Sequence, residues 1–103
     1  MEAGRVLANG FYPAVVESVW PKDGPYGEYW EWNFRVETVR LKTFTSGNLK
    51  HEKTRSFVEA MLNRSVDPTE ELSPSYFGGE HWTVEVGTII KNGRAYNSIQ
   101  KVI

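Results

Sequence analysis

The chain contains no cysteine, has almost no excess of either charge and has no long hydrophobic run. Without cysteine there are no disulfides, thiolate metal sites or thiol nucleophiles. Its 12 basic residues nearly balance its 13 acidic ones, which excludes a polycationic binder but not a local basic patch. No stretch approaches the roughly 20 apolar residues of a membrane span, and residues 1–8 lack the apolar run of a signal peptide. We expect a cytoplasmic protein that does not enter a membrane.

Residues typical of catalytic and metal sites are also scarce. The two histidines, His51 and His81, each lack a second histidine three or four positions away. The sequence has neither the Gly-x-Ser-x-Gly motif of serine hydrolases nor a Walker phosphate-binding loop. Glu70 and Glu71 form an acidic pair in a polar connection, where we expect them to be exposed. We therefore expect a protein that is not an enzyme and uses no metal and no cofactor.

What the chain does have is the composition of one small folded domain. Its 103 residues are enough for a single domain, spanning 1–103, and leave no room for a second. Hydrophobic residues make up 40% and charged residues 24%, which excludes a disordered chain. Aromatic residues are abundant at 14%, enough to build a core, a binding face, or both.

The clearest pattern lies in residues 28–37, where apolar and polar side chains alternate. A period of two is typical of a strand with one buried and one exposed face. We predict that Trp30, Trp32 and Phe34 lie in the core. An aromatic, an amide and a guanidinium on the other face suit a nucleobase, although glutamates beside them repel phosphates. That face is expected to carry Tyr29, Glu31, Asn33, Arg35 and Glu37.

Three further segments are rich in β-branched and aromatic residues and are predicted to be strands: 11–20, 81–90 and 95–103. Residues 21–27 hold two glycines and two prolines, which predicts a loop. Gly87 interrupts the alternation of its strand and predicts a bulge. Asn92-Gly93 predicts a two-residue type I′ turn between the last two strands.

Residues 39–45 alternate as well, and predict a strand with Leu41 facing one way and Arg40, Lys42 and Phe44 the other. A helix is expected somewhere within 49–64, beginning at Thr54 or at Ser56 as the N-cap. Its apolar residues form a single short stripe, which predicts that one face packs on something larger. The stripe consists of Phe57, Val58, Met61 and Leu62.

The resulting order β-β-β-α-β-β is that of the OB-fold, an all-β five-stranded barrel with one helix at its end. OB-fold barrels bind oligonucleotides or sugars on the face of the second and third strands. The loops between strands one and two and between strands four and five flank that face. An SH3-like barrel, or a half-open sheet carrying one helix, would keep most of the same strands and is the alternative.

Four stretches of the sequence also resemble a known group of proteins: residues 10–19, the aromatic strand at 28–37, residues 44–46 before the helix, and residues 92–102. They look like small OB-fold, single-stranded-DNA-binding-like proteins of phages and prokaryotes, many of them uncharacterised. The resemblance spans about the whole chain as a pattern, without a signature motif. It implies an OB barrel that binds single-stranded nucleic acid, DNA above all.

In such a barrel, several basic and aromatic side chains would converge on one surface, although each alone reads as a solvated residue. Basic residues would follow the phosphates, and aromatic residues would stack on bases with weak sequence preference. The candidate nucleic-acid-binding residues are Lys22, Tyr26, Tyr29, Arg35, Arg40, Lys42, Phe44, Lys91 and Arg94.

Two other function classes fit the same residues. Exposed aromatics suit a protein partner equally well, as in an OB-fold subunit of a replication, recombination or phage assembly. Aromatic platforms also stack on sugars, but the basic residues would then have no obvious role. We expect single-stranded nucleic acid as the partner, with a protein-interaction module as the main alternative. The sequence does not indicate an oligomeric state.

Overall fold

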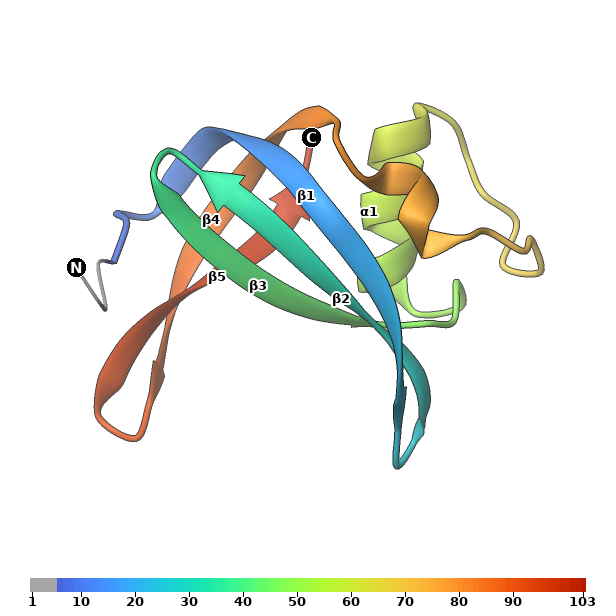
Figure 1. The fold of residues 1–103 in the computed structure, drawn as a ribbon, viewed down its shortest axis with the longest axis horizontal. Coiled ribbons are helices and arrows are strands. Elements are labelled where there is room, and N and C mark those ends of the chain that lie inside the picture. The colour runs from blue at the N-terminus through green and yellow to red at the C-terminus, as the bar shows by residue number, and fades with distance from the viewer. Residues whose placement is uncertain (1–5) are drawn as a thin grey trace.

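The computed structural model describes residues 6–103 and folds as a strongly bent antiparallel sheet with one helix against it (Figure 1). The predicted number and order of strands and the single helix are confirmed. A short 3-10 helix between the α-helix and the fourth strand was not predicted. The elements are β1 (Gly10–Gly24), β2 (Gly27–Val36), β3 (Val39–Ser46), α1 (Glu52–Leu62), η1 (Pro74–Phe77), β4 (His81–Lys91) and β5 (Arg94–Val102).

The strands are hydrogen-bonded in the order β3-β2-β1-β4-β5, so β3 and β5 are the two edges. These edges approach each other, and the backbone N–H of Ile99 in β5 donates to Oγ1 of Thr43 in β3 at 3.3 Å. Within residues 6–103, however, no ladder of backbone hydrogen bonds joins β3 to β5. The sheet curls like a barrel but is not closed into one, which is where the structure departs from the predicted OB-fold barrel.

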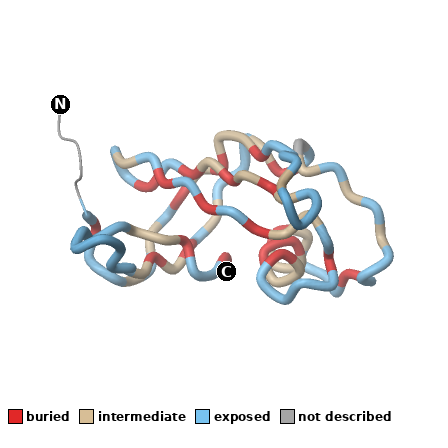
Figure 2. The backbone as a smooth tube through the Cα atoms, turned by 90° about the horizontal axis from the view of Figure 1, so that it is seen from below, coloured by how far each residue is buried: buried red, intermediate tan, exposed pale blue. Residues whose placement is uncertain are grey.

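The core lies on the inner face of the bent sheet, and buried positions alternate with exposed ones along the strands (Figure 2). The predicted core residues Trp30, Trp32 and Phe34 are buried, with Trp32 fully inaccessible. The Trp32 indole packs edge-on against Phe57 of α1, and its Nε1 donates to Oγ1 of Thr45 at 2.8 Å. A buried indole N–H needs such a partner, so β3 satisfies the polar atom of the central core residue.

The loop predicted over residues 21–27 is too long. Most of that segment continues β1 in register with β2, as the pairs Pro21–Trp30 and Lys22–Tyr29 show. Only Pro25 and Tyr26 form the turn. Pairing with β2, whose apolar and polar residues alternate regularly, outweighs the local preference of proline and glycine for loops. Proline is tolerated in this part of β1 because the other edge of the strand does not pair with β4 there. The result is a long β1–β2 hairpin that extends beyond the helix-bearing body (Figure 1).

The helix packs its predicted stripe into the core, with Phe57 and Val58 fully buried and Met61 nearly so. Neither predicted N-cap is correct. The N-cap is His51, without a side-chain hydrogen bond, and Ser56 lies inside the helix, where its hydroxyl donates to the Lys53 carbonyl. The preceding turn sets this start, since Thr54 instead donates its hydroxyl to the Ser46 carbonyl and ties the helix to the end of β3.

The β4–β5 hairpin has the predicted two-residue turn. Lys91 pairs with Arg94, and Asn92 and Gly93 adopt φ of 54° and 75°, the positive values that a type I′ turn requires. The bulge predicted at Gly87 is wrong: Gly87 pairs regularly with Ser98, and the register shift between Glu85 and Val86 leaves the extra residue, Gln100, on β5.

Candidate nucleic-acid interface

The outer face of β1, β2 and β3 presents side chains in cross-strand rows. In an antiparallel sheet, directly opposed residues share a face, with Cβ atoms about 5 Å apart. Register makes Glu31 of β2 the neighbour of Trp20 in β1 and of Phe44 in β3. The adjacent rows are Lys22–Tyr29–Ser46 and Ser18–Asn33–Lys42, and Arg35 pairs with Arg40 at the far end. Six of the nine predicted binding residues therefore lie on one surface: Lys22, Tyr29, Arg35, Arg40, Lys42 and Phe44.

Aromatic side chains occupy one half of this surface. Trp20 is 56% exposed and Phe44 is 53% exposed, although both are large hydrophobic groups. The ring of Tyr29 meets Phe44 edge-to-face, with centroids 5.8 Å apart. Exposed aromatic faces on neighbouring strands provide stacking surfaces for unpaired bases. We call Trp20, Tyr29 and Phe44 the aromatic row.

A polar network lies beside the aromatic row. The Asn33 side-chain amide donates to Ser18 Oγ at 3.1 Å and to Glu31 Oε2 at 3.2 Å. Lys42 Nζ lies 3.6 Å from the other oxygen of Glu31. The hydrogen bond from Asn33 and the charges of Lys42 and Lys22 lower the pKa of Glu31, against an opposing effect of burial. The carboxylate is therefore ionised at neutral pH.

The other end of the face is basic but internally paired. Glu17 lies 3.4 Å from Arg35 Nη1 and 3.2 Å from Arg40 Nε. Glu17 and Arg40 border a surface hollow of about 380 Å³ that Ser18 and Asn33 also line. A phosphate group entering the hollow would compete with Glu17 for Arg40. Exposed ion pairs of this kind contribute only about 0–1 kcal/mol each, so the exchange is not prohibitive.

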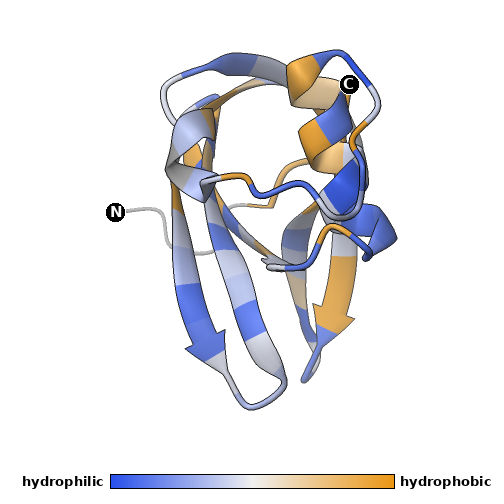
Figure 3. Ribbon diagram, turned by 90° about the vertical axis from the view of Figure 1, so that its right-hand side faces the viewer, coloured by the Kyte–Doolittle hydropathy of each residue, from blue (hydrophilic) through white to orange (hydrophobic). Residues whose placement is uncertain are grey.

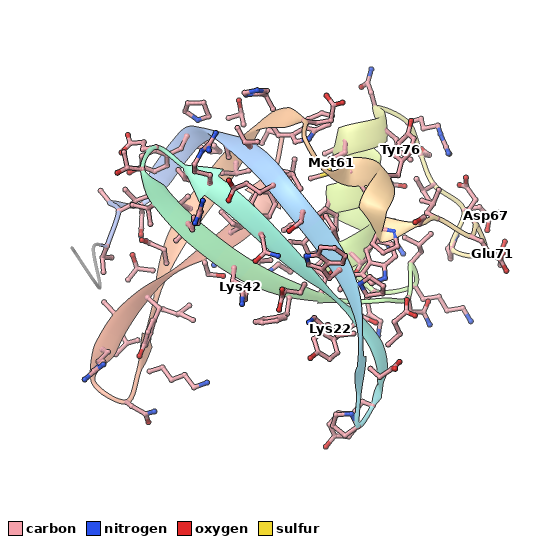
Figure 4. The ribbon with its side chains drawn as sticks, viewed as in Figure 1. Lys22, Lys42, Met61, Asp67, Glu71 and Tyr76 are labelled. Carbon is pink, nitrogen blue, oxygen red and sulfur yellow. The ribbon has the colours of Figure 1, made fainter. Side chains whose placement is uncertain are left out.

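The remaining three predicted residues lie at the hairpin ends. Tyr26 is fully exposed in the β1–β2 turn, and Lys91 and Arg94 flank the β4–β5 turn. Both hairpins project to the same side of the molecule (Figures 1 and 3). Lys22 and Lys42 lie toward that side as well, away from Met61 of the helix (Figure 4). The structure thus places the tips at the margins of the candidate surface, without joining them to the cross-strand rows.

The sequence reasoning missed three residues of β1 on this surface: Glu17, Ser18 and Trp20. A register shift between Val16 and Ser18 changes the phase of β1, so that Val16 and Val19 are both buried and Trp20 points outward. A strict period of two does not predict this. In the sequence, the bulge is signalled only by the apolar residues Val16 and Val19, which are three positions apart and therefore do not fit a period of two.

No protein-family model and no curated protein sequence matches this chain. Within residues 6–103, no group of three or more histidine, aspartate or glutamate side chains is placed to hold a metal ion. The helices of the same described part are all too short or too polar to cross a membrane.

Proposed function

We propose that the protein is a single-stranded nucleic-acid-binding module of the OB-fold type, with DNA as the favoured ligand. One observation carries the proposal: exposed aromatic rings and basic side chains occupy the same outer face of β1–β3. The aromatic row would stack on successive bases, and each stacked base would contribute about 1–3 kcal/mol. The role is one of binding and involves no catalysis.

The architecture supports the OB-fold assignment. The strand order, the helix between β3 and β4 and the contact between Thr43 and Ile99 are what a slightly opened OB barrel would have. OB-folds bind single strands on the second and third strands, between the first and last hairpins. In this protein β2 carries Tyr29 and β3 carries Lys42 and Phe44, and both hairpins project on the same side.

The balance of charge sets the expected affinity. Four basic side chains on this face stand against two carboxylates, and both carboxylates already contact the basic groups. We expect modest affinity that falls as salt rises. If two to four phosphates are neutralised, the logarithm of the binding constant should fall with the logarithm of salt with a slope of about −1.4 to −2.8.

The test is a titration followed by intrinsic tryptophan fluorescence. Trp30 and Trp32 are buried, whereas Trp20 lies on the proposed surface, so stacking on Trp20 should quench the signal. At low salt, a single-stranded oligonucleotide of about 15 nucleotides should bind, and its duplex should bind more weakly because its bases are already stacked. The absence of binding to the single strand would refute the proposal.

A charge-reversed variant tests the location. Arg40→Glu with Lys42→Glu should abolish binding. It should lower the free energy of unfolding by only about 1–2 kcal/mol, because both side chains are largely exposed and the ion pairs that they lose with Glu17 and Glu31 are weak. The matched control is Lys50→Glu with Lys53→Glu, which makes the same change in net charge beside the helix. Acidic residues suit a helix N-terminus, so this control should fold. Equal loss of binding in both variants would place the ligand elsewhere.

A protein-interaction module is the second candidate, favoured by one observation. Ile89 and Ile90 near the end of β4 are exposed, as is Tyr96, which pairs with Ile89 across the hairpin. Exposed apolar side chains gathered on one hairpin are typical of contact surfaces. If the oligonucleotide titration fails, this hairpin is the surface to test.

A further inference from the structure

One carboxylate lies among the residues of the aromatic row and has no part in the proposed function. Glu31 lies directly between Trp20 and Phe44 in the cross-strand register, and Tyr29 precedes it by two residues on the same strand. A carboxylate is unfavourable for a surface that binds only phosphates. Its position among stacking rings instead places it where the edge of a stacked base would lie.

Glu31 is held in place rather than free in solvent. Its side chain is only 15% exposed, with one oxygen facing Lys42 Nζ at 3.6 Å and the other accepting from Asn33 at 3.2 Å. Asn33 is in turn anchored on Ser18. An ionised carboxylate offers about four acceptor positions and no donor. The two contacts hold the carboxylate in a fixed orientation and leave some of its acceptor positions free. A side chain needs both properties to recognise a base by hydrogen bonds.

We propose that Glu31 selects the base stacked on the aromatic row, favouring guanine and disfavouring thymine. The inference rests on the proposed single-strand-binding function. It names a specificity-determining residue and a preferred base for that same face. It also replaces the expectation of weak sequence preference with a definite order of bases.

The donor pattern of the bases gives this order. The Watson–Crick edge of an unpaired base is open to the protein when the base is splayed out and stacked. Guanine presents two adjacent donors there, N1–H and the 2-amino group, which match the two oxygens of a carboxylate. Cytosine and adenine present one amino group beside an acceptor. Thymine presents a single N–H between two carbonyl oxygens, and these repel a carboxylate. A good bidentate contact separates the right base from the wrong one by roughly 5- to 150-fold.

The experiment compares single strands of about 15 nucleotides in a lithium buffer, which suppresses guanine quadruplexes. An oligonucleotide of alternating thymine and guanine should bind roughly tenfold more tightly than oligothymidine. Replacing each guanine with hypoxanthine removes only the 2-amino group and keeps the purine ring for stacking. The hypoxanthine strand should lose most of the advantage over oligothymidine. This comparison uses the unmodified protein, so it does not depend on the folding of any variant.

Two variants assign the effect to Glu31. Glu31→Gln removes the charge and turns one acceptor into a donor, so the guanine-to-thymine ratio should approach one while affinity for oligothymidine rises. Glu17→Gln is the matched control, since it removes a paired carboxylate from the same face but away from the aromatic row. It should raise affinity for both strands and keep their ratio.

Three results would overturn the inference. Equal binding of the guanine and thymine strands, or of the guanine and hypoxanthine strands, would refute base selection while leaving single-strand binding intact. A guanine preference that persists in Glu31→Gln would assign selection to another residue. The absence of binding to every strand would refute the proposed function itself, and this inference with it.

Discussion

Trp20 and Trp32 belong to neighbouring strands of one sheet but lie on opposite faces, so the same truncation should affect different properties. Trp32→Ala removes a fully buried indole that packs on Phe57. It should lower the free energy of unfolding by roughly 3–5 kcal/mol. Trp20→Ala should cost clearly less, about 1–2 kcal/mol, since half of its side chain is already exposed. It should instead weaken single-strand binding by about 1–3 kcal/mol.

A urea melt and an oligonucleotide titration of both variants separate the two effects. Because Trp20→Ala removes the fluorophore at the site, its binding is followed by the anisotropy of a labelled oligonucleotide. Comparable losses of stability in the two variants would mean that Trp20 is a core residue. Unchanged binding in Trp20→Ala would remove it from the interface.

At the scale of single elements, β4 and β5 show how a turn fixes the register of a hairpin. Gly93 has φ of 75°, and a Cβ added there would meet no atom within 4 Å. Substitution therefore acts through the backbone alone. Gly93→Val should destabilise the protein by roughly 1–3 kcal/mol, because a β-branched residue is strained at positive φ. Gly93→Asn should lose clearly less, since asparagine tolerates this conformation. Equal unfolding midpoints for the two variants would contradict the type I′ turn.

Strands without irregularities were the elements that the sequence could predict. In β2 and β3 the period of two holds throughout, so the faces of Trp32 and Phe44 followed from the pattern alone. In β1 the shift after Val16 reversed the phase, and Trp20 was missed. The burial of Phe77 against Trp32 could not be predicted either, because Phe77 belongs to a short 3-10 helix with no periodic signal. Tertiary packing decides such positions, and no local pattern reports it.

For the molecule as a whole, the curvature of the sheet determines what the candidate surface can contact. The chain extends over 41 × 30 × 21 Å, with the helix packed against one end of the sheet and both hairpins reaching away from it (Figure 1). The polar face of β2 is open because the core lies wholly on the other side. Which ion pairs form on that face, such as Glu17 with Arg40, depends on the register between strands that are distant in the sequence, and no local pattern predicts it.

The contact between the sheet edges is the last structural feature with a direct test. Oγ1 of Thr43 accepts the N–H of Ile99, and both residues are buried. Thr43→Val keeps the shape but leaves that N–H without its acceptor, which should cost about 1–3 kcal/mol. Hydrogen exchange at the Ile99 amide should also become faster, because β5 would separate from β3 more readily. Thr83→Val, at an exposed position of β4, is the control and should change neither property. If Thr43→Val matches this control in both stability and exchange, side-chain packing alone holds the two edges together. The curvature that presents Trp20, Glu31 and Phe44 as one surface would then not depend on the hydrogen bond.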